Sequence, residues 1–156
     1  MEWYYKNGCD GIFAVCQSSE IFCLTLEERV KIAKTVADKA KTLAQADNSR
    51  KPMEIVVSGH IYDSFEAQAE ELNAMAGTGA DALILITNRM DVANVSDEAW
   101  IANLHKLIEK LSENIPFGLD ECPKPYKRLL TKKCCGRALI RADFRSSKIP
   151  VATRRR

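Results

Sequence analysis

A short polar segment at residues 16–20, Cys-Gln-Ser-Ser-Glu, carries the side chains best suited to chemistry in this sequence. It follows an apolar run, residues 11–15, that we expect to form a buried strand. It precedes Thr25 and Glu28, whose spacing is that of a capping box at a helix start. Because ligands bind at the carboxyl ends of parallel strands, this loop lies where the chemistry of a parallel α/β fold is expected.

Apolar runs alternate with amphipathic segments in the same βα order along the chain. We expect strands at residues 11–15, 53–57, 81–86 and 115–119, and helices at residues 1–6, 26–45, 64–75 and 96–111. Asp63 or Ser64 would cap the third of these helices, and Ser96 the fourth. The strands begin about one βα unit apart and are apolar throughout, which favours a parallel sheet covered on both faces. The fold class is therefore α/β.

Charge divides the chain near residue 130. Residues 124–156 contain 12 of the 23 Lys and Arg residues but only one of the 21 Asp and Glu residues, Asp143. The hydrophobic periodicity also ends here. We therefore expect a domain over residues 1–130 and a basic, poorly patterned C-terminal tail over residues 131–156.

The C-terminal tail gives three further expectations. Residues 131–136 are too short and polar for a full helix, residues 137–144 are expected to form a strand, and disorder is expected from residue 145 onward. The basic charge could attract nucleic acid. No aromatic platform is interleaved with the Lys and Arg residues, and no nucleic-acid-binding motif is present, so this partner is not favoured.

Composition favours a protein with no membrane span, metal site or disulfide scaffold. No apolar run approaches the roughly 20 residues that a span needs, and no signal sequence is recognisable. Several of the six cysteines lie in or beside apolar runs, which favours free thiols in a reducing, cytoplasmic setting. Cys134 and Cys135 lack the CxxC spacing of metal ligands, so we expect neither a metal nor another cofactor.

Four short motifs occur along the chain. Each motif alone is weak evidence for a protein family, but their combination at these intervals is specific. They are Asp-Gly-Ile at residues 10–12, Ser-Ser-Glu at 18–20, Leu-Thr-Leu-Glu-Glu-Arg at 24–29 and Glu-Cys-Pro-x-Pro-Tyr-Lys-Arg-Leu-Leu at 121–130. In this combination the sequence resembles the dihydrodipicolinate synthase and N-acetylneuraminate lyase family. The resemblance implies a (β/α)8 TIM barrel and lyase or aldol chemistry on pyruvate or another 2-oxo acid through a lysine Schiff base. Such a barrel takes ~250 residues, so we expect a partial barrel, roughly half of one.

The resemblance also implies site residues. The loop at Gln17, Ser18 and Ser19 would hold the substrate carboxylate. Asp120 stands where the family has the strand-five tyrosine that shuttles protons. A carboxylate can relay a proton, so Asp120 is the candidate catalytic residue. Glu20 is expected to orient the loop or cap a neighbour, not to act as an acid.

The lysine that forms the Schiff base has no counterpart in the expected sixth strand. That strand falls on residues 137–144, where Arg141 or Ala142 occupies the slot. A guanidinium stays protonated and is a poor nucleophile. We therefore expect a truncated chain that is inactive alone. The alternatives are a non-catalytic 2-oxo-acid-binding module and a barrel fragment that self-associates through open strand edges, giving a homo-oligomer.

Three other polar side chains each have two interpretations. His60 follows a strand, so it either lines the mouth of the site or is a hydrogen-bonded structural histidine. His105 lies mid-helix and is expected to be a packing or surface residue. Arg89 could bind an anion, although a solvated loop arginine is the favoured interpretation.

Overall fold

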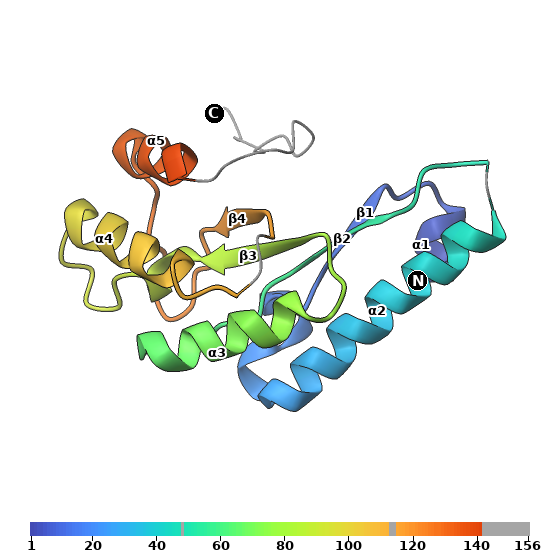
Figure 1. The fold of residues 1–156 in the computed structure, drawn as a ribbon, viewed down its shortest axis with the longest axis horizontal. Coiled ribbons are helices and arrows are strands. Elements are labelled where there is room, and N and C mark those ends of the chain that lie inside the picture. Colours follow the sequence, from blue (N-terminus) through green and yellow to red (C-terminus); the bar gives the residue numbers. More distant parts are fainter. Residues whose placement is uncertain (48, 113–114, 142–156) are drawn as a thin grey trace.

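The computed structural model describes residues 1–47, 49–112 and 115–141, in which helices and strands alternate (Figure 1). The strands are β1 (Gly11–Ala14), β2 (Glu54–Val57), β3 (Ala82–Ile86) and β4 (Phe117–Asp120). The helices are α1 (Glu2–Lys6), α2 (Leu26–Ala46), α3 (Phe65–Ala76), α4 (Asp97–Ile108) and α5 (Lys132–Arg141). Short 3-10 turns follow β1, at η1 (Gln17–Ser19) and η2 (Ile21–Cys23), and β3, at η3 (Thr87–Arg89).

The strands form one parallel sheet in the order β1-β2-β3-β4. Helices α2, α3 and α4 connect successive strands, and α2 and α3 lie side by side along the sheet (Figure 1). Strands that follow one another in the chain are also neighbours in the sheet, and a helix joins each pair. This is the βα repeat that the sequence predicts. All four carboxyl ends therefore lie at one edge of the sheet, together with the loops that follow them. This is the topology of a partial α/β barrel.

One face of the sheet is buried under the helices. Side chains alternate along each strand, and the pairing register places Ile55, Val57 and Leu83 on the same face. These residues belong to the hydrophobic core, together with Leu72 of α3 and Trp100 of α4. Burial of this face explains why the apolar runs fold as strands beneath amphipathic helices.

The opposite face is less covered, and we call it the open face. It carries Gly11, Phe13, Glu54, Val56, Ala82, Ile84, Ile86, Gly118 and Asp120, of which Ala82 and Ile86 are buried. Phe13 is 37% exposed, Val56 and Ile84 are half-buried, and none of these three packs in the core cluster. The prediction that both faces are covered is therefore wrong at Phe13 on β1 and only partly met at Val56 on β2 and Ile84 on β3. A partial barrel explains this, because the inner face of a barrel is buried only by strands across the ring.

Side-chain caps start the three long helices where the sequence predicts them. The Thr25 hydroxyl accepts from the Glu28 N–H at 3.2 Å, and a Glu28 carboxylate oxygen accepts from the Thr25 N–H at 2.8 Å. Ser64, not Asp63, caps α3 by accepting from Ala67 N–H at 3.3 Å, and Ser96 caps α4 in the same way at 3.1 Å. Each cap satisfies an N–H that the helix itself cannot.

The segment after residue 130 departs from the prediction. Residues 132–141 form a helix, α5. The expectation that residues 131–136 are too short and polar for a full helix is therefore wrong, and so is the expected strand at residues 137–144 as far as Arg141. The Thr131 hydroxyl accepts from the Cys134 N–H at 3.2 Å, as an N-cap does. Cys134 is fully buried in the core, and α5 packs against α4. Residues 142–144, and the disorder expected from residue 145, lie outside the described residues.

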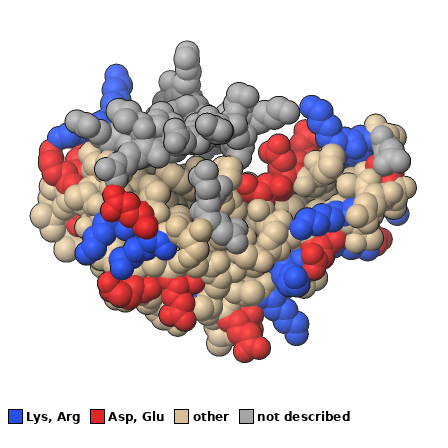
Figure 2. Space-filling model, in the orientation of Figure 1, with Lys and Arg blue, Asp and Glu red and all other residues tan. Residues whose placement is uncertain are grey.

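Charges of both signs are mixed on the surface. Figure 2 shows Lys and Arg side chains interspersed with Asp and Glu on the face in view, with no run of a single sign among the coloured residues. Across the described ranges, none of the helices combines the length and apolar character that crossing a membrane requires.

Candidate functional site

The loop after β1 is held in an uncommon backbone conformation. Val15, the residue directly after β1, has φ of +53° and is fully buried, and Glu20, the C-cap of η1, has φ of +55°. Positive φ is costly for a residue with a side chain, most of all for a β-branched one. Such conformations persist only where surrounding contacts impose them, and they concentrate at ligand sites. The loop at residues 16–20 thus combines a strained backbone with the position expected of a site.

Hydrogen bonds inside the loop gather two serine hydroxyls around one thiol. The Cys16 sulfur lies 3.3 Å from Ser18 Oγ and 3.7 Å from Ser19 Oγ, and the Cys16 N–H donates to Ser19 Oγ at 3.4 Å. Burial raises the pKa of the Cys16 thiol, but the hydrogen bonds with Ser18 and Ser19 outweigh it and hold that pKa below its usual range. Ser18 is exposed and Ser19 half-buried, so both hydroxyls remain near the surface.

The segment after β4 joins this loop. The buried Cys122 thiol donates to Gln17 Oε1 at 3.2 Å, which ties the loop after the first strand to the loop after the last. Asp120 lies on the open face at the carboxyl end of β4, where burial, and to a lesser extent Glu121, raise its pKa against the effect of Lys127. Asp120 makes no hydrogen bond to Ser18 or Ser19, so the structure brings Gln17, but not Asp120, into direct contact across the site.

Glu121, the residue directly after β4, is engaged by the C-terminal segment. One of its carboxylate oxygens accepts from the Leu130 N–H at 2.7 Å. This contact fixes the start of the C-terminal segment and leaves Asp120 as the single carboxylate of the pair on the open face. The two acids therefore do not form a paired-carboxylate site.

An aromatic ring with two cationic groups close to it adjoins the loop. Phe22, on η2, has the Arg89 guanidinium 5.6 Å from its ring centroid and the Lys124 ammonium 4.9 Å from it. Arg89 is only 9% exposed and pairs with Asp63 at 2.7 Å. The favoured prediction of a solvated arginine is therefore wrong, because Phe22 covers Arg89 and Asp63 holds it. No sequence pattern indicates this arrangement, since the three residues come from different loops.

His60 is a structural residue. Its Nε2 accepts from the Ile86 N–H at 2.6 Å, so its Nδ1 is the donor to Gln68 Oε1 at 3.1 Å. The ring is fully buried, and burial, aided by Arg89 and Arg29 and opposed by the Gln68 hydrogen bond, lowers the pKa of His60 to about 4. The imidazole is therefore neutral near pH 7 and joins β2 to β3 and α3. Of the two interpretations, the structural histidine is confirmed.

A buried ion pair supports the loop after β2. Arg29 Nη1 lies 2.7 Å from Glu71 Oε1, and both side chains are almost completely buried. Arg29 also donates to Gly59 O, and Glu71 Oε2 accepts from the N–H groups of Ile61 and Tyr62 at 2.9 and 3.2 Å. The pair thus fixes the turn between β2 and α3. Spacing along the chain gives no indication of it, because 42 positions separate the two residues.

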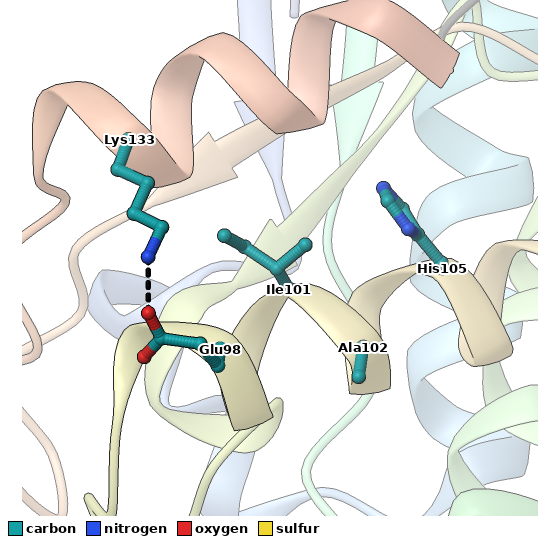
Figure 3. A pocket seen from close by; sticks show the side chains of 5 residues that line it. All are labelled: Glu98, Ile101, Ala102, His105 and Lys133. Carbon is teal, nitrogen blue, oxygen red and sulfur yellow. Dashed lines mark hydrogen bonds and ion pairs between the residues drawn. The ribbon is translucent and has the colours of Figure 1, made fainter.

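A hollow elsewhere in the molecule offers little for chemistry. It measures about 470 Å³, lies between α4 and α5, and is lined by Glu98, Ile101, Ala102, His105 and Lys133 (Figure 3). An ion pair between Lys133 and Glu98 bridges the two helices at one end. His105 is half-buried here, as expected of a packing or surface residue. The residues that line this hollow lie on α4 and α5 and not on the loops at the carboxyl ends of the strands, and its Glu98 and Lys133 charges are paired with each other.

Metal ligands do not cluster in the part of the chain that the structure describes. No group of three or more His, Cys, Asp or Glu residues is placed there to hold an ion. All six cysteines are free thiols.

Solved structures identify the fold, while the sequence matches no protein-family model and no curated protein. A dihydrodipicolinate synthase superimposes with a TM-score of 0.60 at 24% identity, over 78% of this chain and 38% of that one. YagE, a prophage protein of the dihydrodipicolinic acid synthase family from E. coli K12, gives 0.59 at 20% identity, over 78% and 36%. CdNal from Clostridium difficile gives 0.62 at 14% identity, over 84% and 40%.

These matches define the class of fold. The described chain is a partial α/β barrel, as the sequence predicts, and its fold is similar to part of these barrels, about two-fifths of whose length it spans. The resemblance that the motifs carry is thus confirmed at the level of the fold.

Proposed function

We propose that this chain is a member of the dihydrodipicolinate synthase and N-acetylneuraminate lyase family that binds a 2-oxo acid such as pyruvate without turning it over. The observation that carries the proposal is the strained loop with η1 (Gln17–Ser19), which closes the carboxyl end of β1 in a fold shared with those barrels. YagE is in complex with pyruvate, which supports a 2-oxo acid as the ligand class. Six free thiols agree with the reducing, cytoplasmic setting that we also propose.

The proposed carboxylate site uses the hydroxyls of Ser18 and Ser19 and the amides of their loop. Gln17 takes part as the residue that anchors the loop, since its side chain accepts from Cys122. Lys124, whose ammonium lies near the Phe22 ring, makes the surroundings favourable for an anion, whereas the charge of Arg89 is already paired with Asp63. Asp120 remains the candidate proton relay. Its raised pKa brings the carboxyl group closer to the range in which it can exchange protons.

The proposed lack of turnover follows from the missing amine. A Schiff base forms when an uncharged lysine amine attacks the ketone and water leaves. By resemblance that lysine belongs to a strand at residues 137–144, but residues up to Arg141 belong to α5, which packs on α4. Lys132 and Lys133 lie on this outer helix and not on a barrel strand.

Calorimetric titration with pyruvate tests the binding site. Weak binding is expected for the wild-type chain, and the double change Ser18→Ala/Ser19→Ala should reduce affinity by about 100-fold or more, because two hydrogen bonds to a charged group, each worth about 1.5–3 kcal/mol, are lost. Thr42→Ala, which removes an exposed hydroxyl on α2 far from the loop along the chain, is the matched control and should bind as the wild type does. Absence of wild-type binding, or equal binding by the double variant, would contradict the proposed site.

Incubation with pyruvate and borohydride tests turnover separately. Borohydride reduces an imine to a stable secondary amine, so a Schiff-base lysine becomes permanently modified. Mass spectrometry of the folded chain should find no adduct. A stable adduct on any lysine would overturn the proposed inactivity while leaving the binding proposal intact.

A self-associating barrel fragment is the second candidate function. The observation that favours it is the position of β1 and β4 as the two edge strands of a parallel sheet. Parallel sheets normally have both faces covered, and an unpaired edge strand is a template for pairing with another chain.

A further inference from the structure

The two edge strands present complementary hydrogen-bonding groups. Asp10 O accepts from the Glu54 N–H at 2.9 Å, and Pro116 O accepts from the Leu83 N–H at 2.9 Å. Successive residues of a strand direct their N–H and C=O groups to opposite sides. The N–H of Phe13 on β1 therefore points away from β2, and the N–H of Leu119 on β4 points away from β3. Both edges are equipped to extend a parallel ladder.

The open face has the composition of a barrel interior. Phe13, Val56 and Ile84 occupy its middle and lie outside the core cluster. Its charged side chains stand at the ends of strands, with Glu54 at the amino end of β2 and Asp120 at the carboxyl end of β4. A sheet face that remains exposed to water carries mainly polar residues. An apolar middle between charged ends instead fits the filled interior and polar mouths of a small barrel.

We propose that two copies of this chain close one eight-stranded parallel ring, with the open faces turned toward each other. Each copy supplies four parallel strands, and eight is the number at which side chains just fill the interior. A two-fold axis that coincides with the axis of the barrel keeps all eight strands parallel. It also makes the two junctions identical, because each joins β4 of one copy to β1 of the other. This chain superimposes on part of closed barrels with TM-scores of 0.59 to 0.62. Its sheet therefore has the curvature that closure of a ring requires.

The ring also changes the site. At each junction Asp120, at the carboxyl end of β4, becomes the neighbour of the other copy's β1, which leads into the loop at residues 16–20. A carboxylate that lacks contact with Ser18 and Ser19 within one copy thus lies beside the equivalent loop of the second. The assembly stands independently of ligand binding, because it rests on the strand edges and the open face alone.

Sedimentation equilibrium of the full 156-residue chain over a range of concentrations tests the assembly. The wild type should behave as a dimer, and Phe13→Asp should raise the dimer dissociation constant by ~30-fold or more, because it buries a charge at the centre of the interface. Ile32→Asp is the matched control, since Ile32 is also 37% exposed but lies on α2. It should leave the dimer unchanged. A monomeric wild type, open-ended aggregates, or equal dissociation by both variants would overturn the proposal.

Amide hydrogen exchange tests the assembly on the wild-type chain alone, so the result does not depend on whether a variant folds. The Phe13 and Leu119 amides should exchange slowly at concentrations where the dimer forms and quickly where it dissociates. Protection that does not depend on concentration would mean that another segment of the same chain covers the edges, and would overturn the proposal. Titration with pyruvate is measured separately, so failure of the assembly and failure of ligand binding are distinguishable.

Discussion

The sulfur of Cys122 lies 3.2 Å from Oε1 of Gln17, although 105 positions separate the two residues in the chain. Cys122 follows the last strand of the sheet and Gln17 follows the first, so this one contact spans the carboxyl edge of the sheet. A flat sheet would keep these loops three strand spacings apart. The contact therefore reflects the curvature of a barrel, and it fixes the loop that carries Ser18 and Ser19.

Removal of the Cys122 thiol should loosen this loop. We expect Cys122→Ala to reduce the free energy of unfolding by about 1–2 kcal/mol, through the lost hydrogen bond and the lost buried sulfur. Urea unfolding measures the change. Cys23→Ala is the matched control, because Cys23 is exposed on η2 and makes no such contact. Equal losses from the two variants would show that the thiol of Cys122 does not hold the loop.

Glycine at position 20 should relieve backbone strain. Glu20 has φ of +55°, a conformation that costs a residue with a side chain about 1–2 kcal/mol. We expect Glu20→Gly to leave the free energy of unfolding unchanged or raise it by up to ~1 kcal/mol, since glycine also gains freedom in the unfolded chain. The same change at Glu27, in the first turn of α2, should lower stability by up to ~1 kcal/mol. Similar losses at both positions would contradict the strain.

Disruption of the buried ion pair between Arg29 and Glu71 should lower the stability of the fold. We expect Arg29→Met to reduce the free energy of unfolding by about 3–5 kcal/mol, because it leaves the Glu71 carboxylate buried without its cation. The double change Arg29→Met/Glu71→Gln should recover part of this loss, since an uncharged amide can still accept from Ile61 and Tyr62. Lys34→Met, at an exposed pair with Asp38 on α2, is the control and should change stability by less than ~0.5 kcal/mol.

His60 should make the fold less stable in mild acid. Its pKa is about 4 in the folded chain, against 6.5 for an unperturbed histidine. As the pH falls below about 6.5, the unfolded state takes up the proton first, so stability falls until the folded state protonates near pH 4. The shift corresponds to about 3 kcal/mol lost across this window. Urea unfolding at several pH values measures it. His60→Gln, which keeps a hydrogen-bonding side chain but does not titrate, should remove this part of the pH dependence; an unchanged slope would contradict the assignment.

Much of the fold could be predicted because it depends on interactions between residues close together in the chain. Thr25, Ser64 and Ser96 start their helices through contacts that span only three residues, so the pattern of residue types was sufficient. The four strands were identified from apolar runs whose lengths suit strands between helical segments. The C-terminal tail was misjudged because the burial of Cys134 against α4 decides in favour of a helix, and no pattern within the tail reveals that contact.

The site was only partly predictable for the same reason. Gln17, Ser18 and Ser19 were found as a polar loop after a strand, and their roles stay predictions. The contacts that surround them, from Cys122, Phe22 and Arg89, join residues of different loops. His60 could be placed after a strand, but its neutral, buried state depends on Gln68 and Ile86.

By itself, the sequence determined the α/β alternation, the helix caps, the parallel order and the resemblance to one family of barrels. These depend on periodicity and on interactions between residues close together in the chain. The tertiary structure decided which face of the sheet is open, which charges are buried and where the loops meet. Those properties depend on contacts between distant segments, where packing and desolvation, and not local preference, set the free energy.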